Sequence, residues 1–218
     1  MLLPPHKPVA VHAWPQGMQA AVDELRGSQA MAVISVATPA AGERSLARAL
    51  IRTALRETMA MFLDQPAAPI ALVSRPGQAI GVDSRLARLH VSVSHMPGMS
   101  VAAIGRSGAM GLDVMHVEQD AAGMSDWARV ALDYLGPTVS DTLQRTSPMQ
   151  RPATFAQAWV HFEARLKCLG LELTEWTPAL AQRLATCRVM ALALPEDCRG
   201  AIAVPSRLAG ATIHASAS

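Results

Sequence analysis

Apolar residues recur every three or four positions over residues 40–62, and this spacing predicts a long amphipathic helix. A second helix is expected over residues 153–169, with Gly170 suited to its C-terminal cap, and a shorter one over residues 125–136. Residues 137–152 are polar and bounded by prolines, so we expect a connector there. The apolar positions of the first helix are Leu46, Leu50, Ile51, Ala54, Leu55 and Met59.

Strands are predicted between these helices. The segment "LHVSVSH", residues 89–95, alternates apolar and polar residues as a half-buried strand does. Two more runs follow it, and the short turns "MPGM" and "RSG" that separate the three are of the hairpin type. The remaining strand predictions cover residues 70–74, 100–105, 108–117, 187–195 and 200–206.

The order helix, strands, helix, strands predicts an α+β fold with two similar halves, each a small antiparallel sheet packed with a long helix. We expect an N-terminal half over residues 1–117 and a C-terminal half over residues 118–206. Residues 207–218 are mostly small and show no periodicity, so a disordered tail is expected.

Composition narrows the class of protein. Half of the residues are hydrophobic and 17% are charged, which is typical of a globular chain. No run approaches the roughly 18 residues of a membrane span, and prolines interrupt the N-terminal segment where an export signal would be apolar. The net charge of +2 comes without a Lys/Arg cluster, which argues against nucleic acid as a partner.

The three cysteines are odd in number and lack C-x-x-C spacing. This pattern argues against a zinc site or a disulfide framework, and favours a cytoplasmic protein. The sequence also contains no G-x-G-x-x-G, P-loop or H-E-x-x-H motif.

Three positions carry candidate chemistry. Asp113 lies inside an apolar strand, and because an unpaired buried carboxylate is costly, we expect a cation, a helix N-terminus or a metal beside it. Glu163 and Lys167 lie four residues apart on a predicted helix; the alternative is a surface ion pair that contributes about 0.2–0.5 kcal/mol. Ser94 and His95 end the first hairpin strand, where the alternative is ordinary turn chemistry.

Asp113 and Glu163 are 163 − 113 = 50 residues apart, so only packing of the long helix against the hairpin could bring them together. Two adjacent carboxylates suit Mg²⁺, which prefers one or two carboxylates together with water and substrate phosphates. Lys167 on the same helix would add a point charge for a phosphate oxygen. The set suggests phosphate transfer or pyrophosphate binding.

The segment "GLDV", followed some fifty residues later by "WVHFEARLK", resembles the signature of 4'-phosphopantetheinyl transferases, in which G-[IV]-D precedes W-x-x-K-E-[AS]-x-x-K. "VSVSH" resembles a strand of the longer, pseudo-dimeric class, the type that activates surfactin synthetase. "ERSLARALIRTALRE" and "CRVMALALPEDCRGAIAV" are similar to its first helix and closing strands. The resemblance spans about residues 40–204, and it implies a pseudo-dimer of the two halves.

The resemblance implies a role for each matching residue. Asp113 and Glu163 would hold Mg²⁺ on the pyrophosphate of coenzyme A, and Glu163 would also accept the proton of the attacking serine. Lys167 would neutralise the charge that develops as the phosphoanhydride breaks. Ser94 and His95 would contact the 3'-phosphate of coenzyme A.

Other positions match the family less closely. Arg44 would help to grip the nucleotide, while Gln78 replaces the lysine of a coenzyme A-binding "G-K-P" loop and Arg75 would compensate for it. Met115 stands where many members have a third carboxylate, and Phe162 stands where a lysine usually precedes the glutamate. Trp159 is expected to be a packing anchor.

The implied activity is Mg²⁺-dependent transfer of 4'-phosphopantetheine from coenzyme A to a serine of an apo acyl or peptidyl carrier protein, giving the holo carrier and 3',5'-adenosine bisphosphate. The enzyme would be a monomer, and its mildly basic balance suits an acidic carrier. One alternative is a degenerate, non-catalytic module that binds coenzyme A or a carrier protein. Another is an unrelated α+β protein in which Asp113 is a satisfied core carboxylate and Glu163 and Lys167 form a surface pair.

Overall fold

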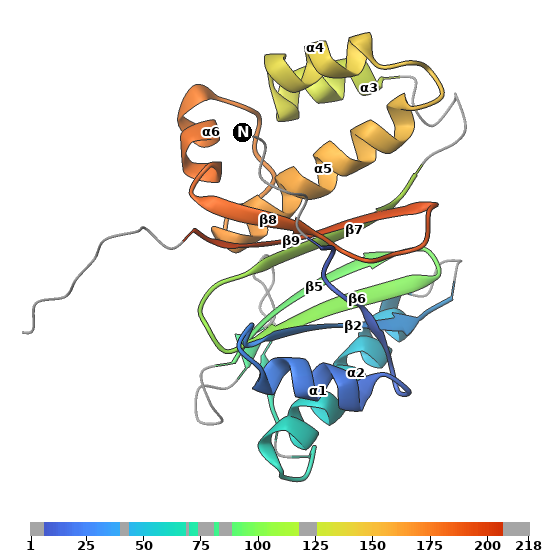
Figure 1. Ribbon diagram of the computed structural model, residues 1–218, viewed down its shortest axis with the longest axis vertical. Coiled ribbons are helices and arrows are strands. Elements are labelled where there is room, and N and C mark those ends of the chain that lie inside the picture. The colour runs from blue at the N-terminus through green and yellow to red at the C-terminus, as the bar shows by residue number, and fades with distance from the viewer. Residues whose placement is uncertain are drawn as a thin grey trace, which may run out of the picture.

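The computed structural model describes residues 7–39, 44–68, 70–73, 81–82, 89–117 and 126–206. Helices and sheets stack in layers (Figure 1). Two helices, α1 and α2, cover one face of a four-stranded sheet, whose other face packs on a three-stranded sheet. Helix α5 covers the far side of the second sheet, and the remaining helices pack on α5. The fold is therefore α+β, as the sequence predicts.

The first sheet has the strand order β1-β2-β6-β5. β1 runs parallel to β2, and the other pairs are antiparallel. The predicted hairpin at "MPGM" is confirmed: Met96 pairs with Met99, and Gly98 has a φ of +81°, which a type II turn requires after Pro97. The bounds are β1 His12–Ala13, α1 Met18–Arg26, β2 Met31–Ala37, α2 Arg44–Leu63, β5 His90–Met96 and β6 Met99–Gly105.

The second sheet has the order β7-β9-β8, all antiparallel, with α5 against it. The hairpin predicted at "RSG" is wrong, because β7 pairs with β9 and not with β6. Both edges of β6 are already occupied, by β2 and by β5. The bounds are β7 Gly111–His116, α5 Arg151–Cys168, β8 Cys187–Ala191 and β9 Cys198–Pro205.

The connector predicted over residues 137–152 is also wrong, because most of it is helical. Pro137 opens α4 and Pro152 lies in the first turn of α5, where a proline has no hydrogen bond to lose. Gly170, with a φ of +64°, ends α5 in a Schellman motif, in which the Leu171 N–H bonds to Leu166 O at 2.9 Å. The other elements are β3 Leu72–Val73, β4 Gly81–Val82, α3 Trp127–Val130, the π-helical turn η2 Ala131–Leu135, α4 Pro137–Arg145 and α6 Pro178–Leu184.

The core follows these layers. Ile51 and Leu55 of α2 are fully buried against the first sheet, and Leu112 of β7 and Ile202 of β9 are fully buried between the two sheets. Burial of apolar surface at each interface, about 25 cal/mol per Å², holds the layers together. No helix within the described part of the chain is both long and apolar enough to cross a membrane.

Two features join the halves besides this core. Serine hydroxyls of β5 reach the edge of β7: Ser92 Oγ accepts the Leu112 N–H at 2.9 Å, and Ser94 Oγ accepts the Val114 N–H at 3.3 Å. Near the N-terminus, Val9 exchanges two backbone hydrogen bonds of 2.8 Å with residues 191 and 193, next to β8. Residues 9–13 therefore contact both sheets.

The two sheets divide between β6 and β7, ahead of the boundary predicted at residues 117 and 118. Each sheet does carry one long helix, α2 or α5. The domain boundary and the pseudo-dimeric relation of the halves stay predictions of the sequence. The predicted tail, residues 207–218, lies outside the described residues, as do Arg75 and Gln78.

Candidate functional site

Asp113 is the centre of the candidate site. It lies on β7 with 7% of its surface exposed, and its side chain faces α5. Ser94 Oγ donates a hydrogen bond of 2.8 Å to Oδ1, and Lys167 Nζ lies 2.7 Å from the same oxygen. Lys167 Nζ also donates to Leu112 O at 3.2 Å. A cation, a helix N-terminus or a metal was expected beside Asp113, and the partner that the structure shows is a cation, Lys167.

Gly111 lets α5 lie close enough for this contact. A Cβ atom at this position would overlap the α5 backbone at Ala164, Lys167 and Cys168. Because glycine has no Cβ, α5 packs directly on Gly111, the first residue of β7. Lys167 can then reach Asp113, two residues further along the strand. The glycine and the aspartate of "GLDV" therefore act together: one sets the spacing of the elements, and the other receives the ammonium group.

Glu163 lies one helical turn before Lys167 and is half-buried. Burial, and next the negative charge of Asp113, raise the pKa of Glu163, while Lys167 opposes the shift. The two carboxylates predicted to meet are therefore close enough to interact electrostatically. Among the described residues Lys167 forms its ion pair with Asp113, so the alternative of a simple surface pair between Glu163 and Lys167 is wrong.

His95 extends the site along β5. Its Nδ1 shares a hydrogen bond of 2.7 Å with Oγ of Ser100, the fully buried residue opposite it on β6. His95 is exposed as a whole, but the protein atoms on one side of it lower its pKa, and the positive charges of Arg48 and Lys167 lower it further. The neutral imidazole is thus favoured beside two cations.

Arg48 was missed by the sequence analysis, which named Arg44 on the same helix. Both arginines are exposed on α2, and it is the charge of Arg48, one turn after Arg44, that lowers the pKa of His95. The four-residue spacing of these arginines places them on one helix face and is the signal that could have identified Arg48.

The donor set fits a hard divalent cation. Asp113 and Glu163 carry carboxylate oxygens, the type of ligand that such ions prefer. Both contacts of Asp113 use Oδ1, so Oδ2 is the oxygen that an ion would take. Met115 packs beside α5 and offers no oxygen, so water and substrate oxygens would complete the coordination.

The aromatic residues of α5 belong to the core, not to the site. Trp159 stacks on Phe155 with ring centroids 6.0 Å apart and meets Tyr134 edge-on at 5.9 Å, so its prediction as a packing anchor is confirmed. Phe162 is 5% exposed and packs in the same cluster. It points away from the carboxylates, which explains why an aromatic residue fits where a lysine was expected.

A groove of about 790 Å³ lies elsewhere, at the turns beside the N-terminal ends of β2 and β7. It includes none of the carboxylates, and its lining mixes polar and apolar residues, among them Ser28, Ser107, Met110 and Arg188. We assign the chemistry to the Asp113 cluster, where charges converge, and not to this groove.

The structure thus brings together Ser94, His95, Asp113, Glu163 and Lys167, while Arg44 lies at the start of α2 without a described contact to this set. No protein-family model matches the chain, and no curated protein matches it significantly.

Proposed function

We propose that the chain is a Mg²⁺-dependent 4'-phosphopantetheinyl transferase that converts an apo acyl or peptidyl carrier protein to its holo form. One observation carries the proposal: the charges of Asp113, Glu163 and Lys167, from a strand and a helix fifty residues apart, interact at one place. The ion pair between Asp113 and Lys167 can be explained by the stability of the fold alone. The half-buried Glu163, a second carboxylate near the first, cannot.

In this proposal Asp113 and Glu163 would hold Mg²⁺, which would supply positive charge to the pyrophosphate of coenzyme A. Lys167 stays on Asp113 Oδ1 and presents its ammonium group to the phosphate oxygens. Glu163 accepts the proton of the carrier serine, whose oxygen bonds to the β-phosphorus as the bond to 3',5'-adenosine bisphosphate breaks. Its raised pKa brings Glu163 nearer to the working pH, as a general base requires.

In this proposal the 3'-phosphate of coenzyme A binds on the β5 side of the site. Ser94 donates its hydroxyl proton to Asp113, so His95 and Arg48 are the groups on this side that can contact an anion. A neutral His95 donates one N–H, and Arg48 supplies positive charge. Arg48 therefore takes over part of the role that the resemblance gives to Arg44.

The proposal is tested by mass spectrometry of carrier proteins. Purified protein is incubated with coenzyme A, Mg²⁺ and a panel of apo acyl and peptidyl carrier proteins, and a gain of one phosphopantetheine per carrier is expected. Glu163→Gln should reduce the rate at least about 100-fold, because general-base catalysis contributes roughly 10²–10⁴-fold. Glu172→Gln, at an exposed position just after α5, is the matched control and should retain the rate.

The rival reading is a module that binds coenzyme A without transfer. Lys167 already neutralises Asp113, Ser94 donates a hydrogen bond to it, and Met115 stands in place of a third carboxylate, so Asp113 has its partners without a metal. Calorimetry separates the two functions. Coenzyme A binding without transfer to any carrier would favour the module, whereas transfer that EDTA abolishes supports the enzyme; no binding and no transfer would contradict both.

A further inference from the structure

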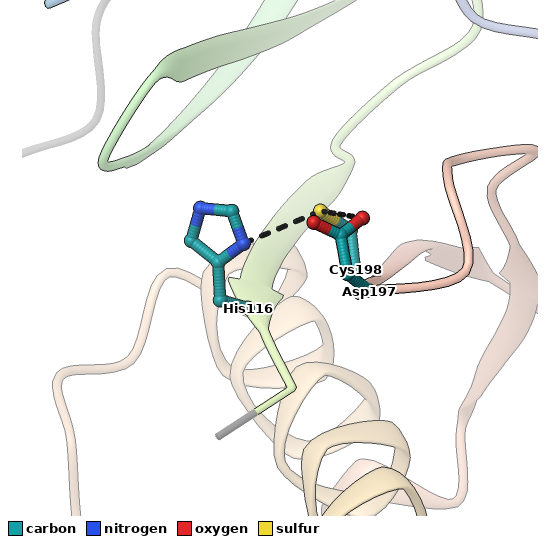
Figure 2. A group of neighbouring side chains, drawn as sticks. All are labelled: His116, Asp197 and Cys198. Carbon is teal, nitrogen blue, oxygen red and sulfur yellow. Dashed lines mark hydrogen bonds between the residues drawn. The ribbon is translucent and has the colours of Figure 1, made fainter. Parts of the chain in front are cut away.

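A second group of side chains converges at the far end of β7, apart from the carboxylate site. His116 ends β7 and Cys198 begins β9, directly opposite it in the strand register, and Asp197 precedes Cys198 (Figure 2). One ligand atom of each lies within 4.8 Å of the others. Cys198 Sγ is 3.5 Å from His116 Nδ1 and 3.4 Å from Asp197 Oδ1.

The hydrogen bonds of His116 fix which of its ring nitrogens is free. Nε2 lies 2.8 Å from Pro97 O, and because a carbonyl only accepts, Nε2 carries the proton. In the neutral ring Nδ1 then turns a lone pair toward Cys198 Sγ. The thiol has one proton for two acceptors, Nδ1 and the Asp197 carboxylate, so the protein atoms leave one of these contacts without a hydrogen.

A metal ion resolves this conflict, since it accepts all three lone pairs at once. Ligands held tetrahedrally at the usual zinc distances, about 2.3 Å for sulfur and about 2.1 Å for nitrogen or oxygen, lie about 3.6 Å from one another. The Sγ–Nδ1 and Sγ–Oδ1 separations agree with this value. The bond from Nε2 to a backbone carbonyl is also the contact that commonly orients a histidine ligand.

We propose that His116, Asp197 and Cys198 bind a Zn²⁺ ion, with the fourth position open to solvent. Thiolate, imidazole and carboxylate together select zinc over Mg²⁺. Asp197 is exposed and His116 half-buried, so an ion can enter, while Cys198 is only 5% exposed. Once bound, the ion would fasten the β8–β9 connection to β7 and, through Pro97, to the β5–β6 turn.

This site is distinct from the carboxylate site and does not depend on the proposed transferase. His116 is three residues beyond Asp113, about 10 Å along a strand, and the odd offset places it on the other face of β7. The spacing of the cysteines argues against a zinc site because the group contains only one cysteine and its histidine is distant in sequence. His116 and Cys198 are 198 − 116 = 82 residues apart, and only the β7–β9 pairing brings them together.

The test uses the whole chain, freed of metal with EDTA and titrated with Co²⁺. We expect one equivalent to give a thiolate-to-cobalt charge-transfer band and the visible bands of tetrahedral Co²⁺, and ZnCl₂ to displace them. Asp197→Asn, at an exposed position, should keep the fold and weaken binding at least tenfold, and Cys198→Ser should abolish the charge-transfer band. Both variants are checked for folding by circular dichroism.

Two controls locate the ion. Cys187→Ser removes the thiol that neighbours Cys168, away from the proposed zinc ligands, and should leave the cobalt spectrum unchanged. Asp113→Asn should likewise leave it unchanged, since it alters only the carboxylate site. Absence of a charge-transfer band in the unaltered chain, or equal affinity in folded Asp197→Asn, would overturn the proposal. So would loss of the band in Cys187→Ser, and transferase activity decides none of these outcomes.

Discussion

At Asp113 one carboxylate oxygen receives both a hydroxyl proton and an ammonium group, and the negative charge of this residue bears on Glu163 nearby. Burial is the larger cause of the raised pKa of Glu163 and this charge the next, so we predict that Asp113→Asn lowers the pKa part of the way toward its ordinary value. A ¹³C-detected NMR titration of the Glu163 carboxyl measures the shift. Asp126→Asn, at an exposed position before α3, is the matched control and should not change it.

The same shift has a consequence for stability. The folded chain holds the Glu163 proton to a higher pH than the unfolded chain does, so between the ordinary and the raised pKa the folded state binds more protons. The free energy of unfolding therefore falls as pH rises through that window. Glu163→Gln should remove this part of the pH dependence in urea unfolding curves; an unchanged slope would show that Glu163 titrates normally.

At the scale of single residues, the sequence identified the charged groups that packing alone does not explain. A carboxylate within an apolar strand implied a partner, and a helix carrying Glu163 and Lys167 suggested where the partner came from. The sequence could not show which carboxylate pairs with Lys167. Helical spacing favours Glu163, and only the packing of β7 on α5 places Asp113 beside Lys167. Arg48 was missed for the same reason, since its effect on His95 depends on tertiary contact.

Among the elements, the contact between β7 and α5 is set by Gly111. We predict that Gly111→Ala forces the helix away from the strand and destabilises the fold by about 1–3 kcal/mol, the usual cost of overpacking. It should also lengthen the Lys167–Asp113 contact and thus change the pKa of Glu163. Urea unfolding and the carboxyl titration measure the two effects.

Gly170→Ala is the control for this substitution. Its added methyl meets nothing within 4 Å, but the φ of +64° makes alanine strained by about 1–2 kcal/mol. Stability should fall while the Glu163 titration stays the same. If Gly111→Ala also left the titration unchanged, Gly111 would have no part in positioning the site.

The elements that the sequence predicted well have strong internal periodicity, as in α2 and α5, or clear alternation, as in β5. Helix α4 was missed because Pro137 was read as a helix breaker, whereas at the first helical position it starts one. The partner of β7 was missed because a short turn does not determine pairing. Occupation of both edges of β6 decides it, and that is a property of the whole sheet.

At the scale of the molecule, the sheets meet where serines of β5 reach β7. We predict that Ser92→Ala leaves the Leu112 amide without its acceptor and increases its hydrogen exchange about 10–100-fold, as expected for loss of a buried hydrogen bond of about 1–3 kcal/mol. The Val114 amide, which bonds to Ser94, should change less. Ser140→Ala, at a buried position on α4, is the control. Equal exchange in all three proteins would mean that the serines do not hold the sheets together.

The pairing of Val9 beside β8 bears on how the chain is made. Val9 and Leu192 are 192 − 9 = 183 residues apart, while His116 of β7 and its partner Cys198 of β9 are 198 − 116 = 82 residues apart. A chain emerging from the ribosome would carry Asp113 and then Lys167 before any strand is available to pair with β7 along its ladder. Early synthesis can complete helix α2 with the hairpin of β5 and β6, but the edge of β7 that pairs with β9 stays unpaired until residues 198–203 have been added. The strand β9 therefore completes the second sheet late in synthesis. Val9 can bond to residues 191 and 193 only after they have been added, whereas β1 can pair with β2 much earlier.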